Sequence, residues 1–486
     1  MRHRRLVIVI ALAAMTSTFS SLYFYRIGSL LYFGDAEAHL NIARRLVDST
    51  TPGVDQLGSP WLPLPHLLMA PWASSMFLWR TGVAGCISGG ICFVAACAFL
   101  YAAVRRLFGE SPACVAVAVL ALNPNTLYLQ SIPMTEPVFL AALLGVFYFT
   151  VRGSVVGAGI MALAATLTRY EGWFLLPFVA LYFLRKRGWL HAIGFSLLAA
   201  TGPLCWLAYN GWYFGNALDF YNGPYSAQAI QGAAWYPGRG QWSTSFQYYF
   251  TTVRLVAGPP LVWICGIGLV VAIFKRVYWP VFFLALPPFF YLWSMHSAST
   301  PIHVPVLWPF SYYNTRYGLA AMPLAALGAA AVASLSPRST LLAASLIVIA
   351  CAGWLWRPGP ETWIAWKESK VNSVARRAWT EQAGEFLRGR LGPGDRVFSG
   401  FSDITGIYRV AGIPLARTLT PNNGVAWTMA TSRPDLFLWE RWAVAQTDDD
   451  VDRAVTRAGS KFELVRKVKV QGAPDLNIYY RQEVPK

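Results

Sequence analysis

Long apolar runs, separated by short polar clusters, dominate the first 356 residues of the chain. A membrane-spanning helix needs about 20 mainly apolar residues, and about eleven runs approach that length. These runs lie at 6–25, 82–104, 112–130, 136–151, 155–168, 173–184, 189–209, 255–274, 278–295, 317–335 and 339–356. The pattern predicts a polytopic α-helical membrane domain over residues 1–356. The short runs at 155–168 and 173–184 meet at Arg169 and Glu171, which predicts charged side chains below the membrane surface.

A different pattern begins after residue 356. Residues 374–390 have charged, helix-like periodicity, and the short apolar runs that follow are separated by Pro and Gly. Residues 357–486 are numerous enough for one small α/β domain with its own core. Within it, residues 448–450 are three aspartates that we expect at the start of a helix, where carboxylates suit the helix dipole. Calcium binding by these aspartates is the weaker alternative.

Basic residues predict the orientation of the membrane domain, because cytoplasmic loops are enriched in Lys and Arg. The chain begins with Arg2, Arg4 and Arg5. The other clusters are Arg105–Arg106, Arg152, Arg185–Lys186–Arg187, Lys275–Arg276 and Arg338. They follow every second predicted span, as alternation requires. We therefore expect a multi-pass plasma (inner) membrane protein with a cytoplasmic N-terminus. The segment 26–81 and the C-terminal domain would lie on the periplasmic or extracytoplasmic side.

Composition supports this topology and excludes other classes of protein. The chain is 55% hydrophobic and only 13% charged, against about 25% charged in soluble domains. The net charge of +17 follows from the cytoplasmic loops, so we expect no nucleic-acid partner. No predicted cytoplasmic loop is long enough for a domain that binds soluble nucleotides. All seven cysteines lie in apolar runs, which predicts small core residues rather than a disulfide framework or a metal site.

The segment 34–48, GDAEAHLNIARRLVD, carries the most concentrated polar chemistry and directly follows the first span. Asp35 is the candidate general base, and the alternative is a helix N-cap. His39, four residues later, would share its helix face, whereas Glu37, two residues later, would not. Arg44 and Arg45, together on this segment, are expected to touch lipid headgroups or phosphates.

Further candidates lie in other segments that the topology places outside. His66 follows a proline-rich interfacial turn, where a structural hydrogen bond is the more common role. Glu136, between Thr135 and Pro137, could supply a second carboxylate, or Thr135 and Pro137 could form an ordinary helix cap. Arg316 suits an anionic headgroup, with interfacial snorkelling as the alternative.

Two further open points concern charge. Arg169 and Glu171 could face a cavity or form an internal pair that pins two helices. Asp35, Glu37 and Glu136 could together hold a divalent cation, although no metal or other cofactor is required by the pattern.

The chain resembles the GT-C membrane glycosyltransferases, and most closely family 39, which contains the protein-O-mannosyltransferase and aminoarabinose-transferase-like enzymes. The resemblance spans most of the first 330 residues. It rests on residues 34–39 (GDAEAH), 63–68 (PLPHLL), 135–137 (TEP), and Arg316-Tyr317 with Pro323. The family often has adjacent Asp-Glu where this chain has Asp-Ala-Glu, and His-Pro-Pro-Leu where it has Pro-Leu-Pro-His.

The resemblance implies an inverting transferase that uses a polyprenyl-phosphate sugar on the non-cytoplasmic face, with Asp35 as general base. We expect Glu37 and Glu136 to act as supporting carboxylates. The expected residues for binding donor phosphate and substrate are Arg316, Arg169, Glu171, His39, His66 and Tyr317. The expected partners are the lipid-linked donor, membrane lipids, and a lipid, glycan or protein acceptor.

Two other functions remain open. A transporter or flippase for lipid-linked glycans would usually show internal repeats with broken helices in matching positions, and the sequence has no convincing repeat. A scaffold that presents the C-terminal domain is a weaker alternative.

Overall fold

The computed structural model describes residues 2–232, 234–297, 300–355, 361–401 and 403–482. The chain divides into two compact units, each built from separate segments. The first, the helical unit, contains Met1–Ile27, Ser59–Pro65 and Cys86–Glu368. The second, the mixed unit, contains Gly28–Gly58, His66–Gly85 and Ser369–Lys486. The boundary predicted between residues 356 and 357 lies outside the described residues.

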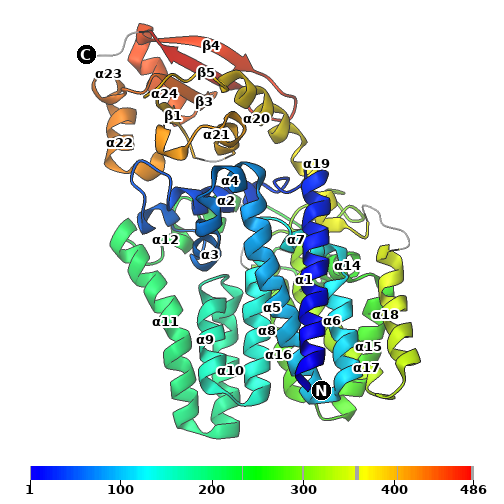
Figure 1. Ribbon diagram of the computed structural model, residues 1–486. Coiled ribbons are helices and arrows are strands. Elements are labelled where there is room, and N and C mark those ends of the chain that lie inside the picture. Colours follow the sequence, from blue (N-terminus) through cyan, green and yellow to red (C-terminus); the bar gives the residue numbers. More distant parts are fainter. Residues whose placement is uncertain (1, 233, 298–299, 356–360, 402, 483–486) are drawn as a thin grey trace. The chain divides into compact units, whose positions relative to one another are not determined.

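Helices occupy all of the predicted apolar runs (Figure 1). They are α1 (Arg2–Arg26), α5 (Val83–Phe108), α6 (Glu110–Ala121), α7 (Pro124–Gln130), α8 (Glu136–Arg152), α9 (Val155–Thr166), α10 (Glu171–Arg187), α11 (Trp189–Phe214), α15 (Pro259–Phe274), α16 (Tyr278–Ser297), the 3-10 helix η2 (Thr315–Ala321), α17 (Met322–Ala333) and α18 (Thr340–Leu355). Between α11 and α15 lie α12 (Asp219–Asn222), α13 (Ala227–Gln231) and α14 (Trp242–Ala257), and after α18 comes α19 (Ile364–Asn372).

The length and apolar character of these helices confirm a polytopic membrane protein. Among the described residues, four helices are long and apolar enough to cross a membrane alone: Arg4–Arg26, Val83–Phe108, Trp189–Phe214 and Thr315–Ala333. The number rises to six if two bent pairs each count as one span. These pairs are α6 with α7, bent by 66°, and α14 with α15, bent by 107°. The direction in which the chain crosses stays a prediction.

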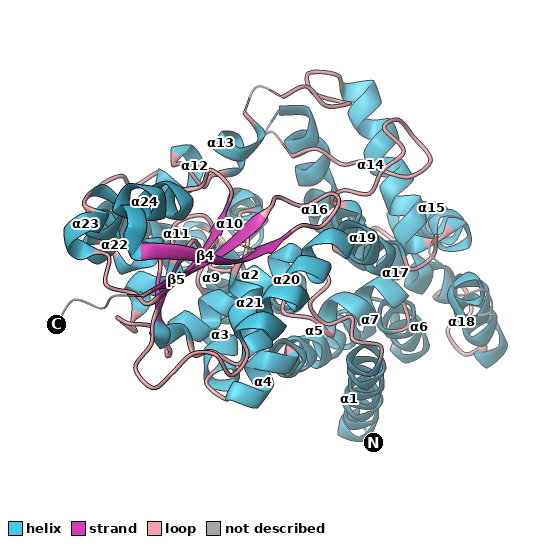
Figure 2. Ribbon diagram, turned by 90° about the horizontal axis from the view of Figure 1, so that it is seen from above, coloured by secondary structure: helices cyan, strands magenta, loops and turns pink. Residues whose placement is uncertain are grey.

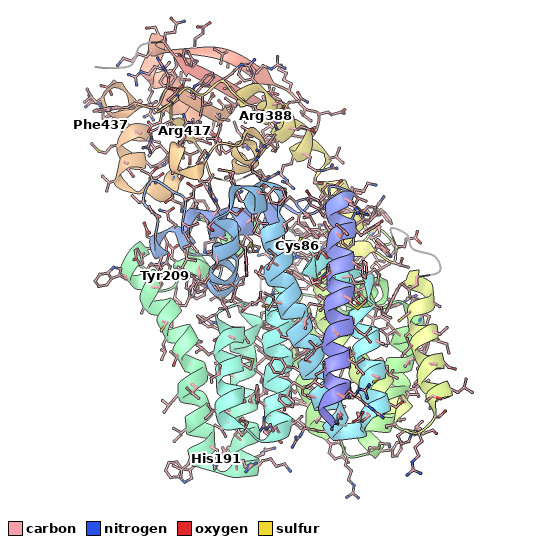
Figure 3. The ribbon with its side chains drawn as sticks, viewed as in Figure 1. Cys86, His191, Tyr209, Arg388, Arg417 and Phe437 are labelled. Atoms are coloured by element: carbon pink, nitrogen blue, oxygen red, sulfur yellow. The ribbon has the colours of Figure 1, made fainter. Side chains whose placement is uncertain are left out.

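Small residues allow the helices of this unit to approach closely. A Cβ atom added to Gly268 of α15 would lie 1.9 Å from the backbone oxygen of Gly328 in α17. Such contacts matter in a bilayer, where helix association depends on close packing rather than on exclusion of water. The cysteines only partly follow the prediction: Cys86 is buried in the helical unit (Figure 3), whereas Cys114 and Cys205 are exposed.

Several predicted cytoplasmic clusters meet at one end of these helices. Arg5 forms an ion pair of 2.6 Å with Glu110 at the start of α6, and Lys275 donates to the backbone oxygen of Ser334 at 2.9 Å. His191 lies at the end of the helical unit where α1 begins (Figures 1 and 3). The predicted site residues lie elsewhere in this unit, at the start of α8, at the start of α10 and in η2.

The chain reverses tightly at the predicted break between two short helices. Helix α9 ends at Thr166 and α10 begins at Glu171. A Cβ atom at Gly172 would lie 2.6 Å from the backbone of Ala165, so only glycine fits this approach. The prediction that two short helices meet at Arg169 and Glu171 is therefore confirmed.

The mixed unit contains an α/β domain with a five-stranded sheet (Figure 2). The strands are β1 (Val397–Ser399), β2 (Thr418–Leu419), β3 (Trp442–Gln446), β4 (Phe462–Val468) and β5 (Leu476–Arg481). Their order is β2-β1-β3-β5-β4, with β1 parallel to β2 and β3, and β5 antiparallel to β3 and β4. The prediction of a small α/β domain in the tail is confirmed.

The helices of the mixed unit come from both ends of the sequence. Its N-terminal elements are α2 (Gly34–Arg45), η1 (Val54–Leu57), α3 (Leu64–Ala73) and α4 (Met76–Thr81). The C-terminal ones are α20 (Val374–Leu387), α21 (Thr405–Ala411), η3 (Leu415–Arg417), η4 (Pro421–Asn423), α22 (Val425–Ser432), α23 (Pro434–Phe437), α24 (Asp450–Ala458) and η5 (Gly459–Lys461). Asp449 caps α24 by accepting a hydrogen bond from the backbone nitrogen of Asp452, which confirms the predicted helix start.

Candidate active site

Five of the predicted site residues meet inside the helical unit: the four charged residues described here, and Tyr317. Glu136 is the first residue of α8, Glu171 is the first residue of α10, and Arg169 lies in the turn before it. Arg316 belongs to η2. Residues that are far apart in sequence thus form one cluster, because the ends of α8, α10 and η2 come together here.

Arg169 connects three of these elements. Its Nε donates to Glu171 at 2.7 Å, and its Nη1 donates to the Thr135 hydroxyl at 2.6 Å and to Glu136 Oε1 at 3.2 Å. Its Nη2 donates to the hydroxyl of Tyr291 at 2.7 Å, and that hydroxyl in turn donates to Glu171. The Thr135 side chain makes no helix-cap hydrogen bond, so it orients Arg169 instead of capping α8.

Arg316 lies between two carboxylates. Its Nε is 3.2 Å from Glu136 Oε1, and its Nη1 is 3.9 Å from Glu368 Oε1. The side chain of Arg316 is only 9% exposed, which excludes the snorkelling arrangement. Burial removes water from a guanidinium group, and nearby carboxylates compensate part of that cost.

Glu368 fixes the start of η2. It accepts hydrogen bonds from the backbone nitrogens of Asn314 at 2.9 Å and Thr315 at 2.7 Å, and from the Thr315 hydroxyl. Burial raises the pKa of Glu368, and the opposing effects of Arg316 and of these hydrogen bonds are smaller. Glu368 therefore both caps η2 and provides negative charge beside Arg316.

A small cavity of about 30 Å³ opens beside the arginines. Its lining residues all belong to the helical unit: Glu136, Phe139, Leu140, Leu143, Arg169, Pro287, Tyr291, Arg316, Tyr317, Leu319, Ala320 and Pro323. Both charged and apolar side chains therefore line the cavity. Among the described residues, no group hydrogen bonds to the buried Oε2 atom of Glu136. Such a cavity suits an amphiphile that carries an anionic group, since guanidinium groups bind phosphate in a fork.

Aromatic rings complete the wall of the cavity. Tyr317 stacks on Tyr291 with a centroid separation of 4.4 Å. The guanidinium carbons of Arg169 and Arg316 lie 5.7 Å and 5.2 Å from the Tyr317 ring, within the range of cation–π attraction. Tyr317 thus helps to keep both cations beside the cavity.

The remaining predicted residues belong to the mixed unit. Asp35 is half-buried in the first turn of α2, where Phe33 occupies the N-cap position. The N-cap alternative for Asp35 therefore does not hold. Both oxygens of Glu37 accept from Arg409, at 2.9 Å and 3.1 Å, and Arg376 lies 3.9 Å away.

Two histidines link α2 to α3. The Nδ1 atom of His39 and the Nε2 atom of His66 are 2.9 Å apart, and both side chains are buried. This hydrogen bond fits the structural role that was expected to be the more common one for His66, and it holds the helix that carries Asp35.

The expectation that Arg44 and Arg45 touch lipid headgroups is wrong. Both are buried. Arg44 pairs with Asp48 at 2.6 Å and donates to the backbone oxygen of Ala73 at 2.8 Å, and Arg45 donates to the backbone oxygen of Gln56 at 2.7 Å. Their charges satisfy carbonyl groups inside the mixed unit, a long-range arrangement that helix periodicity does not reveal.

The two groups of candidates belong to different units, so the convergence of Asp35 with Glu136 and Arg316 stays a prediction. Among the described residues, no group of three or more His, Cys, Asp or Glu side chains is arranged to hold a metal ion. Sequence reasoning missed Tyr291 and Glu368. Tyr291 gave no signal beyond a hydroxyl within an apolar run, and Glu368 lies just after the last span without a recognisable motif.

Comparisons with known proteins bear on the fold. No protein-family model and no curated protein sequence matches the chain. ArnT from Cupriavidus metallidurans, in a crystal structure bound to undecaprenyl phosphate, matches with a TM-score of 0.60 at 16% identity, over 98% of each chain. The same protein in the apo state matches with a TM-score of 0.56 at 16% identity, again over 98% of each chain.

The oligosaccharyltransferase from Archaeoglobus fulgidus in the apo form matches with a TM-score of 0.49 at 15% identity, over 91% of this chain and 69% of that one. The likeness to ArnT extends over nearly the whole chain. The chain therefore has the fold of ArnT. In this chain, the fold comprises a polytopic helical part and a small C-terminal α/β domain.

Proposed function

We propose that this chain is an inverting glycosyltransferase that moves a sugar from a polyprenyl-phosphate donor to an acceptor hydroxyl. The observation that supports this most is the cavity of the helical unit, where Arg169 and Arg316 adjoin an apolar wall. A polyprenyl phosphate has the same two parts, a phosphate and an apolar chain. ArnT, which shares the fold, has been crystallised with undecaprenyl phosphate.

The proposed reaction needs a cationic site for the leaving group and a base for the acceptor. The acceptor oxygen attacks the anomeric carbon of the sugar as the bond from that carbon to the phosphate oxygen breaks. The electron pair of that bond leaves with the polyprenyl phosphate, whose charge Arg169 and Arg316 stabilise. Asp35 takes the acceptor proton, a contribution of about 10²–10⁴-fold in rate.

The other predicted residues receive supporting roles. Glu171 and Tyr317 orient the arginines through the contacts described above. His39 and His66 hold α2 in place. Glu37, through its ion pair with Arg409, fixes the position of Asp35 on the same helix.

We place this reaction on the non-cytoplasmic face of the plasma membrane, in accordance with the basic clusters at the opposite ends of the spans. The acceptor is a lipid, a glycan or a protein that carries a free hydroxyl. A divalent cation is an optional addition to this mechanism, because the arginines already supply positive charge for the leaving group.

Transfer by the purified full-length chain in nanodiscs provides the test. Synthetic polyprenyl-phosphate sugars serve as donors, and released polyprenyl phosphate is quantified together with the glycosylated acceptor. Asp35→Asn should keep the thermal midpoint of the wild type but lose turnover by roughly 10²-fold or more. Asp55→Asn, in the same predicted outer segment 26–81, is the matched control and should retain turnover.

Two outcomes would contradict the proposal. Undiminished turnover of Asp35→Asn would remove Asp35 as the base. Transbilayer movement of a lipid-linked glycan without any bond change, by a chain that releases no polyprenyl phosphate from any donor, would favour the transporter alternative.

A further inference from the structure

The charges around the cavity present a difficulty for anion binding. Glu136 and Glu171 balance Arg169 and Arg316, and Glu368 adds a further carboxyl beside Arg316. The two arginines thus bring no surplus positive charge to the cavity. A phosphate that entered without any other change would face carboxylates at close range, and like charges repel strongly in a buried site.

Glu136 differs from the other carboxylates in its contacts. Its Oε1 is 3.2 Å from Arg169 and also 3.2 Å from Arg316, so one oxygen lies between two guanidinium groups. Glu171, in contrast, is held at 2.7 Å by Arg169 and accepts from Tyr291. The contacts of Glu136 are longer than the 2.7–2.9 Å typical of a strong charge-assisted hydrogen bond.

The second oxygen of Glu136 gives an independent indication. Glu136 is only 8% exposed, and its Oε2 has no hydrogen-bond partner among the described residues. An unsatisfied carboxylate oxygen in a buried site costs free energy. The carboxylate of Glu136 therefore lacks part of its hydrogen bonding, although it lies between the two arginines.

The position of Glu136 leads to the same conclusion. Glu136 lines the cavity, and its carboxylate lies between both guanidinium groups. An anion that is to contact both arginines must therefore displace this carboxylate.

We infer that the carboxylate of Glu136 is a placeholder for the phosphate of the lipid ligand. In the empty protein it neutralises Arg169 and Arg316 and keeps them apart at a spacing that suits an anion. On binding, the phosphate replaces this carboxylate on both guanidinium groups, while Glu171 and Glu368 continue to orient the arginines. When the reaction ends, the returning carboxylate competes with the product phosphate and favours its release.

This inference rests on the proposed function, because it specifies how the same site takes its ligand. It gives Glu136 a positioning role rather than that of a proton acceptor. It also predicts that the affinity for the lipid phosphate depends on which carboxylate is removed. A general effect of charge would instead change this affinity equally for each carboxylate.

Binding of undecaprenyl phosphate to the full-length chain in nanodiscs provides the test, with Glu136→Gln compared to Glu171→Gln. Both substitutions remove one negative charge from a carboxylate that pairs with Arg169, but only Glu136 lines the cavity. Glu136→Gln should bind roughly tenfold more tightly than the wild type, whereas Glu171→Gln should bind no more tightly. Glu136→Asp keeps the charge but shortens the side chain, so it should lie between the wild type and Glu136→Gln.

Steady-state kinetics provide a second measurement, which a purely structural role of Glu136 would not change. In Glu136→Gln, both KM for the donor and kcat should fall, because donor and product are each held more tightly and release becomes slower. A folding defect would lower the amount of active protein and leave KM unchanged.

Each other outcome has a definite meaning. Equal tightening in Glu136→Gln and Glu171→Gln would overturn the placeholder and indicate a general charge effect. Unchanged or weaker binding in both Glu136→Gln and Glu136→Asp would also overturn it, with the proposed function intact if the wild type binds. A wild-type chain that does not bind undecaprenyl phosphate would contradict the proposed function and this inference together.

Discussion

Two buried clusters of arginine and glutamate, one in each unit, use the same chemical groups in different ways. In the mixed unit, Glu37 is held by both nitrogens of the Arg409 fork, and Arg376 lies nearby. In the helical unit, Glu136 shares one oxygen between Arg169 and Arg316, and the other oxygen is unpartnered among the described residues. The cavity described above adjoins this second cluster.

This difference separates a cluster that stabilises the fold from one that can exchange partners. A bidentate pair satisfies both ions, so it contributes to holding α2 against α21. A shared and incompletely satisfied carboxylate leaves its arginines available to an incoming anion. A buried ion pair therefore indicates function when its hydrogen bonding is incomplete and a cavity lies beside it.

Removing one arginine from each cluster should have the largest effect. Arg316→Ala should weaken binding of undecaprenyl phosphate by roughly 10²-fold or more, because truncating one partner of a buried charge contact costs a few kcal/mol. Arg409→Ala should leave that affinity within about threefold, although both variants lose thermal stability. Binding isotherms and thermal midpoints of the full-length chain provide the measurement, and equal loss of affinity in both variants would contradict the distinction.

A second prediction concerns how stability depends on pH, and it involves Glu368, which lies beside Arg316. Burial raises the pKa of Glu368 above its ordinary value of 4.5. At pH values between the unfolded and folded pKa, the folded chain therefore holds a proton that the unfolded chain has released. Stability is then highest below that ordinary value and falls as pH rises through the folded pKa. The thermal midpoint in detergent should therefore decrease over this acidic range.

Glu368→Gln is the control for the pH prediction, because the amide keeps the shape of the side chain and cannot ionise. The thermal midpoint of Glu368→Gln should decrease less than that of the wild type as the pH rises. The same decrease with pH in the variant and in the wild type would mean that another group is responsible.

The smallest expected effect lies in the α/β domain. Asp449→Ala removes the side-chain cap of α24 and should lower the free energy of unfolding by about 1 kcal/mol. Undecaprenyl phosphate affinity should not change, since Asp449 belongs to the mixed unit. Thermal midpoints and binding of the full-length variant measure this, and a large loss of affinity would show that the two units are energetically coupled.

The sequence indicated the right residues in the helical unit but not their partners. Arg169 and Glu171 were noticeable because charges rarely interrupt apolar helices, and Glu136 and Arg316 because they adjoin predicted span ends. Tyr291 gave no such signal, since a tyrosine in an apolar run is ordinary. Glu368 was missed because its partners, the backbone nitrogens of Asn314 and Thr315, have no side-chain pattern.

In the mixed unit, local sequence patterns predicted the secondary-structure elements but not which of their side chains are buried. The helix start at Asp449 followed from aspartates before a helical pattern. Arg44 and Arg45 were assigned to headgroups because a polar segment beside a span suggests exposure, yet both donate to carbonyl groups inside this unit. Burial of that segment depends on elements such as α21 and η3, which lie hundreds of residues later in the chain.

The sequence by itself determined that this chain is a helical membrane protein with a small α/β tail, where its helices break, and which charges deserve explanation. These features depend on local hydrophobic periodicity and on the cost of charge in a bilayer, both of which are readable along the chain. Only the tertiary structure decided that Glu136, Arg169, Glu171 and Arg316 form one cluster and that Glu37 pairs with Arg409. Those contacts join residues from distant segments, and no local pattern specifies which distant partner satisfies a buried charge.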